Sequence, residues 1–256
     1  MPVQNQYFAK GNYTIENYLS NREGKKITAS AISNVLFKSG ETKSISHQLN
    51  VADVRLWSVE NPYLYRVVSL LKQNGKTIDS VTQRFGIRTI DIKTNGVFVN
   101  GKHEKIKGVN CHQDHAGVGS ALPDDIQYYR IKLLKEMGVN AYRTSHHAPT
   151  PELLDACDSL GMLVMDEQRL LNSSPEYIDQ FDRLLKRDRS RASVFMWSIG
   201  NEEGWIHTTS HGKRIAQTFI AKLKQLDPTR TCTYAADLGN VFPGVNEVIP
   251  VRSFNY

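Results

Sequence analysis

The spacing of hydrophobic residues along the chain changes near Ile92. Before it, short segments in which apolar and polar residues alternate are separated by turn residues. The pair Asn74-Gly75 between two such segments is typical of a type I′ β-hairpin, because both residues accept the positive φ angles of that turn. Short strands at this spacing predict an immunoglobulin-like β-sandwich over residues 1–92. We expect its core to contain Leu56, Trp57, Leu64, Tyr65, Val67 and Val81.

After Ile92, buried-type strands alternate with amphipathic helices, which is the pattern of a parallel sheet with helical crossovers. Thr150-Pro151 puts proline at a first helical position, and Gly161 is a typical helix end. We expect strands at 106–110, 140–145, 162–166, 194–200, 232–236 and 248–254, with helices beginning near Asp124, Thr150, Pro175 and Gly212. Because a complete barrel of this kind has eight strands, residues 93–256 are predicted to form an α/β domain, a (β/α)8 TIM barrel truncated after about six strands.

The strand predicted at 194–200 ends in an abrupt change of polarity. Buried-type residues from Val194 to Ile199 are followed directly by Gly200, Asn201 and Glu202. In β/α barrels the chemistry takes place at the carboxyl ends of the strands, so a carboxylate at this point is a candidate catalytic group. The alternative is that Glu202 only caps the next helix or pairs with a nearby arginine.

Composition and charge narrow the classes of partner. Hydrophobic residues make up 40% of the chain and charged residues 23%, as in an ordinary globular protein. No apolar run approaches the roughly 18 residues of a membrane span, and the polar N-terminus predicts no signal peptide. The net charge is +6, but basic residues are scattered among acidic ones, so we expect neither a nucleic-acid nor a membrane partner. Three widely spaced cysteines indicate neither a zinc site nor a disulfide framework.

Six short motifs follow one another in order along the chain. They are LWSVENPYLY and RFGIRTI in the first half, then GVNCHQDHAGVG, AYRTSHHAPT, VMDEQ and WSIGNEEG at the ends of the first four predicted barrel strands. Together they resemble glycoside hydrolase family 2, which contains β-galactosidases, β-glucuronidases and β-mannosidases, and the likeness is greatest to its β-galactosidases. The resemblance extends from about Leu56 onward and implies an immunoglobulin-like domain followed by a catalytic barrel.

The resemblance also implies roles for individual residues. Glu202 matches the general acid/base, and Asn201 matches the residue that hydrogen-bonds the sugar 2-hydroxyl. His112 and His146 match histidines that line the sugar subsite. Arg143 matches an arginine that supports the nucleophile. An alternative for Arg143 is an ion pair with Asp166 or Glu167 that ties two strands together, and the two roles are compatible.

A retaining glycosidase needs two carboxylates about 5–5.5 Å apart, one to protonate the leaving oxygen and one to attack the sugar. In the family that the motifs resemble, the nucleophilic Glu stands at the end of the seventh strand, which places it beyond residue 256. Glu167, Glu203 and Glu247 are poor replacements by their positions in the predicted barrel. We therefore expect the isolated chain to be inactive. Some of the family's β-galactosidases bind magnesium after the third strand, but the stretch 167–174 lacks those ligands, so we expect no essential metal and no cofactor.

Three functions stay open at this point. The leading hypothesis is hydrolysis of terminal β-galactosides, with a β-linked oligosaccharide or glycoside as the partner. The second keeps the fold and changes the sugar, giving a β-glucuronidase or a β-mannosidase. The third is a carbohydrate-binding or structural fragment without catalysis. A homo-oligomeric parent protein and a bacterial cytoplasmic or periplasmic location are also left open by the sequence.

Overall fold

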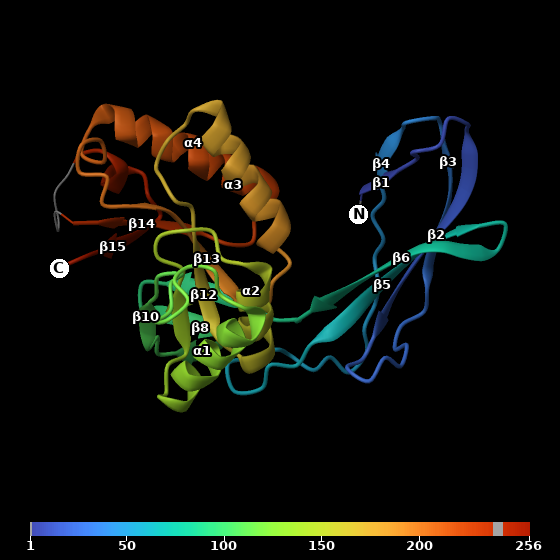
Figure 1. Cartoon of the computed structure of the whole chain (residues 1–256), viewed down its shortest axis with the longest axis horizontal. Coiled ribbons are helices and arrows are strands. Elements are labelled where there is room, and N and C mark those ends of the chain that lie inside the picture. Colours follow the sequence, from blue (N-terminus) through green and yellow to red (C-terminus); the bar gives the residue numbers. More distant parts are fainter. Residues whose placement is uncertain (1, 238–242) are drawn as a thin grey trace. The chain divides into compact units, whose positions relative to one another are not determined.

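The computed structural model describes residues 2–237 and 243–256. The chain forms two compact units (Figure 1). Met1–Leu56 and Tyr63–Ile87 make one, which we call the sandwich unit. Trp57–Pro62 and Arg88–Tyr256 make the other, which we call the barrel unit. Within the described residues no helix has the length and apolar character needed to cross a membrane.

The sandwich unit contains two antiparallel sheets. The larger has the strand order β3-β2-β5-β6, and the smaller pairs β1 with β4. Their bounds are β1 (Pro2–Gln4), β2 (Gly11–Ser20), β3 (Ala31–Phe37), β4 (Thr42–Ser44), β5 (Tyr65–Gln73) and β6 (Lys76–Phe85). Burial alternates along β2, so one face of this strand packs inward while the other meets solvent. The interior holds two small groups of apolar side chains, one around Tyr13, Ile15 and Phe37, the other around Leu19, Tyr63 and Tyr65.

The hairpin expected at Asn74-Gly75 is confirmed, because β5 and β6 pair across these two residues. Their φ angles are 50° and 77°, both in the left-handed region that a type I′ turn requires. The sequence signal succeeded here because the turn is a local property of two residues.

The expected sandwich core needs correction. Tyr65 is buried, and Leu64 and Val67 are half-buried, but Leu56 is 43% exposed and Val81 is 54% exposed. Val81 lies on β6, an edge strand whose side chains are almost all exposed. Trp57 is fully buried, but in the barrel unit, where its Nε1 donates to the Asp158 carbonyl at 2.8 Å. An apolar residue type predicts that a side chain is buried, but it does not predict in which of the two units.

The barrel unit is built on one parallel sheet whose six strands neighbour one another in sequence order. They are β10 (Gly108–Asn110), β11 (Ala141–Arg143), β12 (Leu163–Glu167), β13 (Val194–Asn201), β14 (Cys232–Ala236) and β15 (Val251–Phe254). A small antiparallel sheet of β7 (Ile90–Lys93), β8 (Gly96–Val99) and β9 (Lys102–Glu104) precedes them. The fold class is therefore a β-sandwich followed by the first six strands of a TIM barrel. Every expected barrel strand is present among the described residues. The last strand, β15, starts later than expected because η1 (Val245–Glu247) precedes it and the amides of Val248 and Ile249 donate back to the Val245 carbonyl.

Helices α1 (Asp124–Glu136), α2 (Pro151–Leu160), α3 (Pro175–Asp188) and α4 (Ser210–Leu226) connect the strands. Thr150 caps α2 by accepting from the Leu153 amide, and Gly161 ends the helix with a φ of 75°. A Cβ on Gly161 would lie 2.3 Å from the Val59 carbonyl oxygen, so only glycine fits there. Helix α4 starts before the expected Gly212 because Thr209 caps it, accepting from the Gly212 amide.

Candidate active site

The turn after β13 places Glu202 at the carboxyl edge of the sheet. Glu202 has a φ of 55°, a left-handed conformation, and its amide donates to the Ala235 carbonyl of β14 at 3.0 Å. Gly200 also has a positive φ of 154°, and a Cβ there would lie 3.0 Å from the Tyr234 ring and 3.1 Å from the Glu203 carboxylate. The Gly-Asn-Glu-Glu sequence is therefore matched to a tight turn that only glycine can start.

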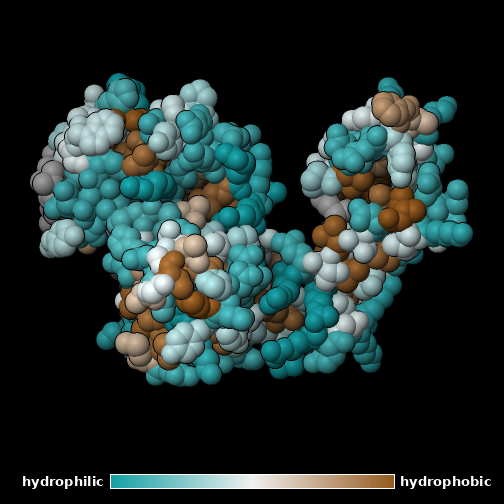
Figure 2. Space-filling view, viewed as in Figure 1, coloured by the Kyte–Doolittle hydropathy of each residue, from teal (hydrophilic) through white to brown (hydrophobic). Residues whose placement is uncertain are grey.

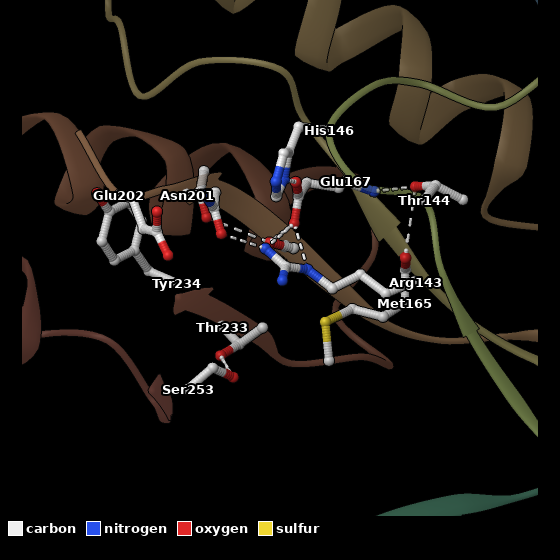
Figure 3. Close-up of polar contacts among 12 residues, drawn as sticks. Arg143, Thr144, His146, Met165, Glu167, Asn201, Glu202, Thr233, Tyr234 and Ser253 are labelled. Atoms are coloured by element: carbon white, nitrogen blue, oxygen red, sulfur yellow. Dashed lines mark hydrogen bonds and ion pairs between the residues drawn. The ribbon is translucent and has the colours of Figure 1, made fainter. Parts of the chain in front are cut away.

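Asn201 is held in one orientation by two donors, of which Figure 3 labels Arg143. Its Oδ1 accepts from Arg143 Nη2 at 2.7 Å and from Asn255 Nδ2 at 2.9 Å. Because a guanidinium can only donate, the oxygen of the Asn201 amide must face Arg143. The amino group of Asn201 is then directed away from Arg143 and is left to donate to a ligand.

The ion pair expected for Arg143 forms with Glu167 and not with Asp166. Arg143 Nε donates to Glu167 Oε2 at 2.7 Å, which joins the ends of β11 and β12. Glu167 is fully buried, and its carboxylate also accepts from Ser198 Oγ at 2.8 Å and contacts His146 Nδ1 at 2.5 Å. Each oxygen of Glu167 is thus occupied, so this carboxylate positions Arg143 and His146.

His146 and His112 lie together at this edge, with ring centroids 5.6 Å apart in an edge-to-face arrangement. The contact between His146 Nδ1 and the Glu167 carboxylate fixes a proton on Nδ1, so Nε2 of His146 remains to face a ligand. The His112 side chain is exposed, and its backbone carbonyl is held by Arg130 Nη1 at 2.9 Å. Burial lowers the pKa of neighbouring His147, which keeps that ring neutral near pH 7.

The two adjacent glutamates have different surroundings. The Glu202 carboxyl is half-buried and accepts from the neutral Asn255 amide at 2.5 Å. Glu203 is buried and turned away, where its carboxylate accepts from the Leu171 amide at 3.1 Å and from the Tyr234 hydroxyl at 2.6 Å. Burial, and next the charge of Glu203, raise the pKa of Tyr234, so its hydroxyl remains a donor. These contacts turn Glu203 away from Glu202, which agrees with the expectation that it is a poor replacement for the nucleophile.

The structure thus brings Arg143, His146, Asn201 and Glu202 to one edge of the sheet, with His112 beside His146. Sequence reasoning missed Asn255, which binds both Asn201 and Glu202. Its position directly after β15 could have identified it, because strand ends meet at the same edge. It also missed Tyr234, since a buried tyrosine within a strand carries no signal of its own.

Among residues 2–237 and 243–256, no three His, Cys, Asp or Glu side chains come together in a way that could hold a metal ion. The absence of an essential metal stays a prediction.

Two sequence models of one protein family match the chain. The model described as glycosyl hydrolases family 2 matches residues 1–88, and the TIM barrel domain model of the same family matches residues 90–174 and 171–256. The chain belongs to glycosyl hydrolase family 2. The order of motifs and the polar cluster at the strand ends agree with this membership.

Relatives in family 2 cover nearly the whole chain. The β-galactosidase BoGH2A of Bacteroides ovatus is 36% identical in an alignment of 209 residues that covers 76% of this chain and 24% of that enzyme. A family 2 member from Bacteroides cellulosilyticus is 33% identical with a TM-score of 0.88, covering 100% of this chain and 36% of that one. The Bacteroides uniformis β-glucuronidase is 27% identical with a TM-score of 0.88, covering 100% of this chain and 33% of that one. The chain therefore spans about a quarter to a third of the length of these relatives.

Proposed function

We propose that this family 2 chain carries the acid/base half of a retaining β-glycosidase, with terminal β-galactosides as substrates. The observation that carries the proposal is the contrast between two carboxylates at one sheet edge. Glu202 accepts from a neutral amide, whereas Glu167 is held by the Arg143 guanidinium. A carboxyl without a cationic partner can hold a proton and give it to a leaving group. Glu202 is therefore the general acid/base.

The neighbouring side chains fit the requirements of the sugar. In the first step Glu202 protonates the oxygen of the scissile bond while a carboxylate attacks the sugar carbon from the other face. The Asn201 amino group, directed away from Arg143, donates to the sugar 2-hydroxyl. His146 Nε2 and the exposed His112 ring line the sugar subsite and hydrogen-bond its other hydroxyls. These bonds strengthen as charge develops on the ring, which lowers the barrier.

No carboxylate near Glu202 in the described part of the chain is suited to be the nucleophile. Glu167 is fully engaged by Arg143, His146 and Ser198, and Glu203 by Tyr234 and Leu171. We infer that the nucleophile comes from a part of the protein outside these residues. Arg143, already fixed by Glu167 and Asn201, then supports that carboxylate. On this basis the isolated chain does not hydrolyse substrate.

The choice of sugar rests on the relatives. Galactose is favoured because the six motifs of this chain are most like those of β-galactosidases, and BoGH2A is 36% identical to it. A putative β-glucuronidase of Formosa agariphila is 38% identical, so percentage identity by itself does not select the sugar. A β-glucuronidase is the second candidate, because the Bacteroides uniformis β-glucuronidase superposes on the whole chain. A β-mannosidase, and a fragment that binds sugar without catalysis, are the remaining alternatives, and binding experiments separate them.

A direct test uses a panel of aryl β-glycosides. The purified chain and its Glu202→Gln variant are both expected to release no nitrophenol. Hydrolysis by the unmodified chain that disappears in the variant would name the sugar and show that the described residues do contain a nucleophile.

Azide from solution can replace the absent nucleophile, so that the contribution of the general acid can be measured. Azide attacks the sugar carbon, the bond to the leaving oxygen breaks, and Glu202 gives that oxygen its proton, which yields an α-galactosyl azide. Phenyl β-galactoside needs this proton more than dinitrophenyl β-galactoside, because phenolate is the more basic leaving group. Glu202→Gln should therefore slow phenol release much more than dinitrophenol release. Equal slowing of the two would remove Glu202 from the role of acid.

Calorimetry with galactose, glucuronate and mannose tests the sugar subsite apart from catalysis. Galactose is expected to bind, and Asn201→Ala to weaken that binding by about five- to tenfold, the value of one hydrogen bond. Stronger binding of glucuronate would replace galactose in the proposal. If none of the three sugars binds, the remaining interpretation is that the chain is a structural fragment.

A further inference from the structure

Trp205 differs from the other two tryptophans of the chain. Trp57 and Trp197 are fully buried, whereas Trp205 is 75% exposed. Single exposed apolar residues are common on protein surfaces, so exposure alone does not indicate a binding role. The position of Trp205 does indicate one, because it stands three residues after Glu202 on the turn that leaves β13.

The backbone of this turn is fixed while the indole is free. The Gly204 amide donates to the Glu202 carbonyl at 2.8 Å, and the Ile206 and His207 amides both donate to the Glu203 carbonyl at 2.9 Å. Ile206 and His207 are both buried, and His207 Nδ1 contacts the Tyr234 hydroxyl at 3.0 Å. Because its neighbours are anchored, Trp205 presents a large apolar ring to solvent at little further cost in backbone entropy.

A carboxylate stands next to this turn. Asp237 follows β14 at the same edge of the sheet, and its Oδ2 lies 4.0 Å from the position a Cβ on Gly204 would take. The Asp237 side chain is one-third exposed, and its Oδ1 lies 3.4 Å from His207 Nε2. The turn therefore offers an aromatic ring and, beside the preceding residue, an acceptor for hydroxyl groups.

The proposed reaction indicates which part of the substrate would contact Trp205 and Asp237. Glu202 protonates the oxygen that joins the sugar to its aglycone, so the aglycone must lie against Glu202. The groups assigned to the sugar, Asn201 and His146, lie together with Arg143 and Glu167, and in Figure 3 Glu202 is on the far side of Asn201 from Arg143. The turn that carries Trp205 starts directly at Glu202, the residue against which the aglycone must lie.

We propose that Trp205 is a specificity-determining contact for the aglycone, taking a second sugar ring or an aryl group on its indole face, with Asp237 accepting hydrogen bonds from hydroxyl groups of that second sugar. The carbon-bound face of a pyranose is apolar and stacks on aromatic rings, while its hydroxyls need polar partners. This inference rests on the proposed function, because it takes Glu202 as the acid. It adds a preference for disaccharides and aryl glycosides over the bare monosaccharide.

The distribution of tryptophans supplies a built-in reporter. Acrylamide should quench mainly Trp205, since the two other indoles are buried. Lactose, which carries a glucose aglycone, is expected to protect the emission of the unmodified chain, and galactose to leave the quenching unchanged. Equal quenching with lactose and galactose at saturating concentration would overturn the proposal.

Calorimetry gives the energetic test. Lactose should bind the chain about three- to tenfold more tightly than galactose, the range expected for one aromatic contact. Trp205→Ala should reduce lactose affinity to that for galactose and leave galactose affinity unchanged, whereas Trp205→Phe should keep most of the difference. Near-ultraviolet circular dichroism of the buried tryptophans checks that the variants are folded.

Two failures of this test are distinct. If the unmodified chain binds neither sugar, the proposed sugar subsite falls and the aglycone contact falls with it. If galactose binds but lactose binds no better, or if Trp205→Ala leaves a lactose preference intact, only the assignment of Trp205 is wrong.

Discussion

The two units of the chain bury their apolar side chains in different ways. In β13 of the barrel unit every residue from Val194 to Gly200 is buried, whereas in β6 of the sandwich unit nearly every residue is exposed. A parallel strand is covered on both faces, but an antiparallel edge strand has one face and one edge open to solvent. In Figure 2 hydrophobic residues are visible on the surface of both units. In the sandwich unit the exposed apolar residues include Ile32, Leu36, Ile78 and Val81.

Polar side chains also differ between the two units. In the barrel unit they gather where strands end, and they are held there by further polar groups, as Glu167 is by Arg143. In the sandwich unit they join strands side by side, as Lys72 of β5 does with Glu16 of β2 at 2.5 Å. A deep core with polar strand ends can fix reacting groups, whereas cross-strand pairs on a thin sandwich only support the sheet. The comparison predicts where substitutions affect chemistry and where they affect stability alone.

The largest expected effect separates chemistry from structure. Glu202→Gln should reduce azide-supported release of phenol from phenyl β-galactoside by about a hundredfold or more, the value of a positioned acid. The matched change Glu16→Gln in the sandwich unit should leave that rate within about twofold, because Glu16 contacts Lys72 and Ser30 and no site residue. A similar loss of rate in both variants would show that the assay reports folding.

The next effect compares the depth of the two cores. Phe181→Ala should lower the free energy of unfolding of the barrel unit by about 3–5 kcal/mol, because Phe181 is fully buried against Phe219 with centroids 4.7 Å apart. Phe37→Ala in the sandwich unit should cost less, about 3 kcal/mol, at the lower end of that range. Phe37 already lines a cavity of about 490 Å³, so the space it leaves opens to water. Hydrogen exchange of amides in each unit measures both values, and an equal loss would contradict the difference in depth.

A smaller effect concerns two buried tyrosine hydroxyls. Tyr234→Phe removes a group that donates to the Glu203 carboxylate at 2.6 Å and accepts from the Glu203 amide at 2.8 Å, which leaves a buried charge short of a donor. We expect a loss of about 1–3 kcal/mol of stability, with a shift of the Glu202 turn visible in its amide resonance. Tyr65→Phe in the sandwich unit removes only an acceptor for the Arg55 amide and should cost about 0.5–1.5 kcal/mol. A larger loss of stability for Tyr65→Phe than for Tyr234→Phe would contradict this prediction.

Two further effects on stability depend on pH and have opposite signs in the two units. Burial, and next the charge of Asp188, raise the pKa of Asp166 well above its usual range. A raised folded pKa gives stability that is present at low pH and is lost as pH rises, by at most about 1.4 kcal/mol per pH unit for one proton. Asp166→Asn removes that loss. The variant should gain stability relative to the unmodified chain between pH 5 and pH 8 in urea titrations.

Glu16 behaves in the opposite way, because hydrogen bonds from Lys72 and Ser30 lower its pKa to about 2. Its contribution is present above its usual pKa near 4.5 and is lost as pH falls toward 2. Glu16→Gln should therefore destabilise the sandwich unit at pH 7, and the difference from the unmodified chain should shrink in acid. A difference that stays constant from pH 7 to pH 3 would contradict the ion pair with Lys72.

Local signals carried most of the fold. The hairpin at Asn74-Gly75, the cap at Thr150 and the six barrel strands were all predictable, because each depends on a few consecutive residues or on a short hydrophobic period. Assignments that need to know which surfaces meet were the ones that failed. Trp57 was expected in the sandwich and is buried in the barrel unit.

The sequence by itself determined the succession of strands and helices, the family, and the side chains placed at each strand end. Only the tertiary structure decided what those side chains do to one another. It set Arg143 between Glu167 and Asn201, brought Asn255 to Glu202, and gave two adjacent glutamates different surroundings. The physical reason is that residues far apart in the chain meet when parallel strands align. The hydrogen bonds and burial that distinguish Glu202 from Glu203 do not exist until that happens.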